Sequence, residues 1–255
     1  MRFALLGSGS EGNALVVQAG RTCVMMDCGF SLGETASRLA RLGLSPENIN
    51  GIVVTHEHGD HIDGVARLSR KYAIPVWLTH GTRLAQREAL AGLQALTEIN
   101  PHHAFAIGDL QIQPYAVPHD AVEPVQYVFG DGARRLGVLT DVGGSTPHIE
   151  ATLNGCDALV LECNHDPGML ANGDYPWSLK QRVGGRYGHL SNEDAAALLA
   201  RLDQRRLQHV VAAHLSSKNN THDLAVGALS TAMGCGAEWI AVATQQEGLD
   251  WREIS

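Results

Sequence analysis

The chain carries the segment Thr55-His56-Glu57-His58-Gly59-Asp60-His61 between two contrasting neighbours. The apolar run Ile52–Val54 before it predicts a strand, and Ile62–Tyr72 after it has helical periodicity. The segment therefore predicts a loop at a strand end, where a rigid scaffold usually displays functional residues. Its imidazoles and carboxylate suit zinc, manganese or iron, and four such groups within six residues exceed the needs of one open catalytic site. The loop thus predicts a pair of metal ions.

On both sides of this loop, short apolar runs alternate with segments of helical period. We predict strands at Arg2–Gly7, Asn13–Ala19, Thr22–Asp27, Ile52–Thr55, Pro75–Thr79, Leu110–Val117, Val125–Gly130, Arg135–Thr140, Ala158–Glu162 and His209–Ala213. We predict helices at Leu32–Gly43, Ile62–Tyr72, Thr82–Leu93, Ile149–Leu153, Asn192–Asp203 and Asp223–Met233, with Ser191 as an N-cap. Because strands are followed by helices in each half, the order predicts an α/β fold with four αββα layers.

Length and composition set broad limits on the protein. A chain of 255 residues with 44% hydrophobic residues can bury a full core, and we expect one domain over residues 1–255. The net charge of −8 provides no global positive field for nucleic acid, so any such contact must be local. Five cysteines without a Cys-x-x-Cys pair argue for a reducing cytoplasm, and we expect no membrane-spanning segment or signal peptide.

The His-x-His-x-Asp-His pattern after a strand resembles the hallmark motif of the metallo-β-lactamase superfamily. Further motifs extend the resemblance over nearly the whole chain. Met26-Asp27-Cys28-Gly29 resembles the first motif of that superfamily and Val117-Pro118-His119-Asp120 the third, while Leu139-Thr140-Asp141-Val142-Gly143 and Ala213-His214-Leu215-Ser216 resemble the fourth and the last. The resemblance implies a four-layer αββα sandwich of the metallo-β-lactamase type.

The same resemblance implies a set of metal ligands and a mechanism. It assigns one ion to His56, His58 and His119, and a second ion to Asp60, His61 and His214. Asp141 would bridge the two ions. Asp27 would orient the loop without binding metal. A shared hydroxide would attack the substrate, with Asp60 among the catalytic residues. Zinc is the first expectation for the two divalent ions, and manganese or iron are alternatives, because His and Asp ligands accept all three.

Four further segments narrow the resemblance. Tyr187-Gly188-His189-Leu190-Ser191-Asn192 and the residues after His214 resemble segments of ribonuclease Z and its relatives. Leu161-Glu162-Cys163-Asn164-His165-Asp166, together with Tyr175-Pro176, resembles the small YycJ/WalJ-type subfamily, described as DNA exonucleases. By this resemblance His189 would be catalytic, as a proton donor to the leaving oxygen or as a phosphate contact; a histidine bonded to backbone is the alternative.

Candidate substrate contacts come from a glycine-rich turn and a local group of cations. The turn Gly7–Asn13 has N–H groups that could donate hydrogen bonds to an anion, although a tight hairpin explains the glycines equally well. Lys180 and Arg182 extend a positive strip within an acidic protein, for which solvated surface charge is the alternative. We expect His165 to be an ordinary loop residue. The candidate substrate-binding residues are Ser8, Ser10, Asn13, Arg186, Ser217 and Lys218.

These features predict a metal-dependent phosphodiesterase, in the first place a nuclease acting on DNA ends or short oligonucleotides. Asp141 stands where zinc-dependent lactamases often have a cysteine, and its hard oxygens suit a phosphoryl group better than a lactam. The chain has no long insert of the kind that larger nucleases of this superfamily use to hold structured RNA. Three alternatives remain open: hydrolysis of carbon esters or thioesters of the glyoxalase kind, hydrolysis of cyclic nucleotides, and a non-enzymatic domain with structural metals.

Overall fold

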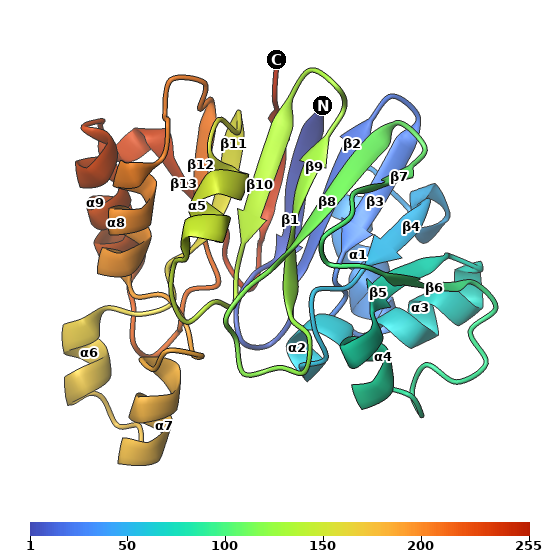
Figure 1. The fold of residues 1–255 in the computed structure, drawn as a ribbon, viewed down its shortest axis with the longest axis horizontal. Helices are drawn as coiled ribbons and strands as arrows, with labels where there is room; N and C mark the ends of the chain where they lie inside the picture. Colours follow the sequence, from blue (N-terminus) through green and yellow to red (C-terminus); the bar gives the residue numbers. More distant parts are fainter.

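The computed structural model describes residues 1–255 as two β-sheets packed face to face between two layers of helices (Figure 1). Each sheet has seven strands. The predicted α/β class and the four-layer αββα arrangement are confirmed. None of the helices has both the length and the apolar character that crossing a membrane requires.

The first sheet is built by the N-terminal part of the chain, with the last strand at one edge. Its strands, in spatial order, are β14 Leu249–Glu253, β1 Arg2–Gly7, β2 Ala14–Ala19, β3 Thr22–Met26, β4 Gly51–Val53, β5 Val76–Thr79 and β6 Leu96–Ile99. The predicted meander β1–β2–β3 is antiparallel, whereas β3 to β6 run parallel. Helices α1 (Leu32–Arg41) and α3 (Val65–Tyr72) lie in two of the crossovers that parallel pairing requires.

The second sheet follows in the chain and confirms the second predicted group of strands. Its spatial order is β13 Ile240–Val242, β12 His209–Ala213, β11 Ala158–Glu162, β10 Arg135–Leu139, β9 Val125–Gly130, β8 Leu110–Ala116 and β7 Phe105–Ile107. Strands β7 to β10 are antiparallel, and β10 to β13 are parallel. Three helices flank this sheet: α5 (Pro147–Leu153), α8 (Asn192–Arg201) and α9 (His222–Met233).

Three apolar clusters hold the four layers together. One fills the space between the sheets, and the other two lie between each sheet and its helices. The alternation of side chains along a strand produces this division. In β11, Ala158 and Val160 belong to the cluster between the sheets, whereas Leu159 and Leu161 belong to the cluster under α8 and α9.

Between β11 and α8 the chain leaves the sandwich. It forms two short helices, α6 (Pro167–Asn172) and α7 (Trp177–Val183), which project beyond the sheets at the same edge as α2 (Gly59–Ile62) (Figure 1). Helix α8 then begins after Ser191, whose hydroxyl accepts a hydrogen bond from the N–H of Asp194, so the predicted cap is confirmed. The sequence did not predict α6 or α7, because neither has a sustained apolar period.

Several predicted boundaries were wrong. The helix expected over Ile62–Tyr72 is divided into α2 and α3 at Gly64, where a Cβ atom would lie 2.1 Å from the carbonyl oxygen of Phe30. The helix expected over Thr82–Leu93 is α4 (His80–Ala85), which begins after its cap Thr79 and ends early. Four short strands at or near the sheet edges, β6, β7, β13 and β14, were not predicted.

Candidate metal centre

Strand ends of both sheets position the candidate site residues. Asp27 follows β3 in the first sheet, and Asp141 and His214 follow β10 and β12 in the second sheet. These three residues have φ angles of 59°, 50° and 55°, a left-handed conformation that residues other than glycine rarely adopt. Such strain is concentrated at functional sites, where the surrounding structure holds it in place. The backbone therefore turns sharply where each of these side chains enters the site.

Three histidines converge on one point, as the resemblance implied. His56 Nε2 lies 3.1 Å from His58 Nδ1, and His119 Nε2 lies 3.3 Å from the same nitrogen. His119 Nδ1 lies 3.0 Å from the carbonyl oxygen of Gly188, which can only accept, so His119 Nε2 is left with a lone pair. Burial lowers the pKa of both His56 and His119 and favours their neutral forms. Facing lone pairs of this kind suit a cation between them.

A second cluster contains two carboxylates and two histidines. The ligand atoms of Asp60, His61, Asp141 and His214 all lie within 4.8 Å of one another. Burial opposes a charge on His214, but the surrounding carboxylates, Asp141 first, raise the pKa of His214 to about 10. A site that favours a positive charge on a buried histidine also favours a metal cation. Asp141, predicted to bridge two ions, belongs to this cluster and not to the group of three histidines.

Two atoms of the second cluster are buried without a hydrogen-bond partner. Oδ2 of Asp141 lies 3.2 Å from Nε2 of His61 and Nε2 of His214 lies 3.5 Å from Oδ1 of Asp141, but neither forms an aligned hydrogen bond. Buried polar atoms are normally paired, so these two call for a partner. Nitrogen and oxygen donors in two adjacent clusters fit divalent metal ions. The residues present therefore fit the group that the sequence implied.

Asp27 contacts two residues of the segment Thr55–His61 and fixes their positions. Its carboxylate accepts hydrogen bonds from the backbone N–H and the hydroxyl of Thr55, each at 2.8 Å, and lies 2.8 Å from Nδ1 of His61. This contact leaves Nε2 of His61 to face the second cluster. Burial raises the pKa of Asp27, while His61 and Thr55 oppose that shift. The geometry agrees with the orienting role expected for Asp27.

The buried carboxylate of Glu162, to which the sequence assigned no role, lies between His189 and His214. Oε1 of Glu162 is 2.7 Å from Nδ1 of His189 and 3.1 Å from Nδ1 of His214. Burial opposes a charge on His189, but Glu162 raises the pKa of His189 above its usual value. Glu162 ends the apolar strand β11, and this position at a strand end is the signal that could have identified it.

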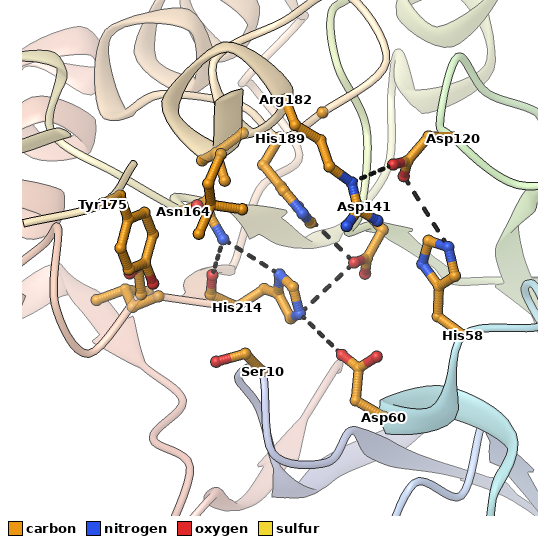
Figure 2. A pocket seen from close by; sticks show the side chains of 15 residues that line it. Ser10, His58, Asp60, Asp120, Asp141, Asn164, Tyr175, Arg182, His189 and His214 are labelled. Carbon is orange, nitrogen blue, oxygen red and sulfur yellow. Dashed lines mark hydrogen bonds and ion pairs between the residues drawn. The ribbon is translucent and has the colours of Figure 1, made fainter. Parts of the chain in front are cut away.

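A polar pocket opens beside the two clusters (Figure 2). Its volume is about 240 Å³, and the loop carrying Ser10 forms one side. Arg182 of α7 is the single lysine or arginine in its lining, and its Nε donates a hydrogen bond of 2.6 Å to Oδ2 of Asp120. Asp120, Asn164 and Tyr175 also line the pocket; each stands in a motif quoted above, but none was assigned a role.

The predicted substrate-binding residues divide into three groups. Ser10 lines the pocket as expected. Ser8 and Asn13 are buried and serve the site from within: the Ser8 hydroxyl accepts a hydrogen bond from the N–H of His214, and Asn13 Nδ2 donates to Oδ2 of Asp60. Most of the N–H groups in this turn are hydrogen-bonded within the chain, several of them to other segments, which leaves few to donate to an anion.

The last three predicted substrate contacts lie outside the pocket lining. Arg186 and Lys218 are exposed, and Ser217 lines a neighbouring groove that shares Ser10 with the pocket. The positive strip therefore enters the pocket through Arg182 alone. His165 is buried and belongs to none of the groups of side chains that could hold a metal ion.

Comparisons with known proteins agree on fold and family. A family model described as "Beta-lactamase superfamily domain" matches residues 22–214. The chain is similar to exodeoxyribonuclease YycJ of Bacillus anthracis, with 36% identity over 88% of this chain and 86% of that protein. It is also similar to exodeoxyribonuclease WalJ of Streptococcus pneumoniae, with 34% identity over 88% and 85% of the two chains. The solved metallo-β-lactamase fold protein YhfI of Bacillus subtilis has a TM-score of 0.76 over 99% of both chains at 15% identity, a likeness of fold.

Proposed function

The chain belongs to the metallo-β-lactamase superfamily, and from this premise we propose that it is a metal-dependent phosphodiesterase, specifically a nuclease that cleaves DNA at strand ends. One observation carries the proposal. Two adjacent clusters of mostly buried His and Asp donors open onto a polar pocket whose lining contains a single lysine or arginine, Arg182. The exodeoxyribonucleases that match 88% of the chain support the choice of nucleic acid as substrate.

The metal requirement is the first part of the proposal. One divalent ion would be held by His56, His58 and His119, and a second by Asp60, His61, Asp141 and His214. Zinc is the first candidate, and manganese or iron are alternatives. When bound, such ions lower the pKa of a water molecule and neutralise charge on phosphoryl oxygens.

The remaining roles fall on side chains of the pocket. Glu162 engages Nδ1 of His189, which leaves Nε2 as the nitrogen available to a substrate. His189 would therefore hold a proton for the leaving oxygen, and Asp60 would keep its place through Asn13. Arg182 would break its hydrogen bond to Asp120 and pair with a phosphate oxygen of the substrate instead.

We also propose that residues 1–255 act as one hydrolase domain. The last strand, β14, pairs with β1 at the edge of the first sheet, and one apolar cluster joins both sheets. A cut between the two halves would therefore expose this shared core and separate the ligands of each cluster.

Hydrolysis of two substrates tests the proposal. The purified protein with zinc or manganese should cleave bis(p-nitrophenyl) phosphate and should shorten DNA from its ends, whereas His58→Ala should lose at least about 100-fold in rate. A thioester substrate on the same preparation tests the carbon-ester alternative. Failure to cleave any phosphodiester, or equal rates for His58→Ala and the natural protein, would reject the proposal.

A further inference from the structure

The pocket beside the metal centre has one aromatic wall. Tyr175 lies between α6 and α7, is half-buried, and lines the pocket together with Asn164 and Leu215. Figure 2 shows Tyr175 on one side of the pocket, with His58 and Asp120 on the other side and His214 between them. A flat aromatic ring therefore stands across the pocket from His58, with His214 between them.

Positive charge lies at both ends of this arrangement. Nζ of Lys218 is 5.7 Å from the centre of the Tyr175 ring. On the far side, Arg182 contacts Asp120 through Nε alone, so its terminal nitrogens remain available to an anion. An aromatic ring flanked by cations is the pattern that single-stranded nucleic acid requires, because bases stack on the ring and phosphates pair with the cations.

The size of the pocket limits what can enter. A volume of about 240 Å³ is slightly below the range of roughly 300–1,000 Å³ that drug-sized ligands occupy, so the space suits one small group such as a single nucleotide. A base inside a duplex has both faces covered by its neighbours, and it must leave the stack before another ring can contact it. A terminal unpaired base already has an exposed face, so it can contact the ring without first leaving a duplex stack.

We propose that Tyr175 stacks against the terminal base of an unpaired nucleic-acid strand, so that the pocket receives one end nucleotide at a time. This inference rests on the proposed nuclease function. In this proposal the segment between α6 and α7 selects a strand end, and the metal centre carries out the hydrolysis.

A fluorescent base analogue provides a direct test. Single-stranded DNA with phosphorothioate linkages to resist hydrolysis would carry 2-aminopurine at the 5′ end, at the 3′ end or in the middle. Binding to the metal-loaded protein should quench the analogue at one of the two ends, and Tyr175→Ala should abolish that quenching. Tyr175→Phe keeps the ring and should preserve it. Quenching only in the middle of the strand, or equal quenching with Tyr175→Ala, would overturn the proposal.

A thermodynamic cycle separates stacking from a structural role of Tyr175. The affinity of the natural protein for the strand should fall roughly tenfold when the end nucleotide is made abasic. The Tyr175→Ala protein should bind the intact strand and the abasic strand with the same affinity, at about the level of the natural protein with the abasic strand. Trp177 is the matched control, because it is a 75% exposed aromatic residue of the same segment outside the pocket lining. If Trp177→Ala gave the larger loss, or if Tyr175→Ala weakened intact and abasic strands equally, the proposal would be wrong.

Failure of this inference is distinct from failure of the proposed function. If the natural protein cleaved bis(p-nitrophenyl) phosphate and DNA ends but showed no coupling between Tyr175 and the end base, stacking alone would be rejected. If it cleaved no phosphodiester, the nuclease proposal itself would fall.

Discussion

Oε1 of Glu162 lies 2.7 Å from Nδ1 of His189, and the Glu162 carboxylate has no exposed surface. Its other oxygen accepts hydrogen bonds from the N–H groups of Val142 and Leu190. The same carboxylate also reaches Nδ1 of His214, so one buried group orients a candidate proton donor and a candidate metal ligand together.

Glu162→Gln should therefore impair catalysis without unfolding the protein. The amide oxygen can still accept from Val142 and Leu190, which turns the NH2 group toward His189 and His214 and forces a change of tautomer. We expect a loss of about 10- to 100-fold in turnover or metal affinity. Steady-state kinetics and metal titration would measure it, with a melting curve as the control. An unchanged turnover would show that the two histidines do not need this carboxylate.

Asp27→Asn should weaken metal binding. Asp27 accepts from Thr55 twice and contacts Nδ1 of His61, and an amide cannot accept at both positions. Metal affinity should fall by about 10- to 100-fold, as for other orienting carboxylates. Competition with a chromogenic chelator would measure the change. The interpretation is wrong if affinity is retained while the protein loses stability, because that result would make Asp27 a purely structural residue.

Arg182→Gln should reduce affinity for nucleic acid in a salt-dependent way. The substitution removes the single lysine or arginine of the pocket lining. Affinity for single-stranded DNA should fall several-fold, and the slope of log affinity against log salt should decrease by about one. Arg186→Gln is the comparison, since Arg186 is exposed outside the pocket and should have less than a twofold effect. Equal effects of the two substitutions would favour a diffuse surface interaction.

Chelation should remove activity and lower the melting temperature while the fold persists. Three apolar clusters hold the sandwich without any of the proposed ligands, so the secondary structure should remain. Ions that bind only the folded state raise its stability, by about 2.7 kcal/mol at a free concentration 100 times the dissociation constant. Circular dichroism and scanning calorimetry, before and after chelation and after metal return, would check both parts. Loss of the far-ultraviolet signal on chelation would indicate a structural role for the metals.

Two glycine substitutions should change stability in opposite directions. A Cβ atom on Gly29 would lie 1.8 Å from the carbonyl oxygen of Asp60, so Gly29→Ala must displace the metal loop. Gly33 lies in α1 with no atom within 4 Å of the added Cβ, so Gly33→Ala should stabilise by up to about 1 kcal/mol. Urea unfolding of both variants would give the signs. A stable and active Gly29→Ala protein would contradict the close approach.

The order of strands and helices indicated the fold, and motifs at strand ends indicated the metal centre. The segment Thr55–His61 follows an apolar run, and so do the positions of His119, Asp141 and His214, which the structure brings near that segment. Because these strand ends belong to two different sheets, periodicity alone could not show that they meet, and the resemblance to the superfamily motifs supplied that step. Their roles as ligands remain a prediction that metal titration must test.

The residues that sequence reasoning missed or misplaced depend on contacts between distant segments. Asn13 and Ser8 were expected to contact substrate, but Asn13 holds Asp60 and Ser8 holds the backbone of His214. Nothing in a glycine-rich turn shows which loop it will pack against. Asp120 and Tyr175 stood in quoted motifs, but their place in the pocket depends on α6 and α7, which have no clear periodicity in the sequence.

The left-handed backbone at Asp141 and His214 has a consequence for laboratory evolution. Glycine would occupy these two positions with less steric cost than the native residues do, and each native residue there costs on the order of 1 kcal/mol. In the absence of bound metal, a screen that rewards heat resistance alone would therefore favour replacing two of the candidate ligands. Variants of this enzyme bred for robustness should be selected under simultaneous demand for turnover, or they will drift toward inert descendants.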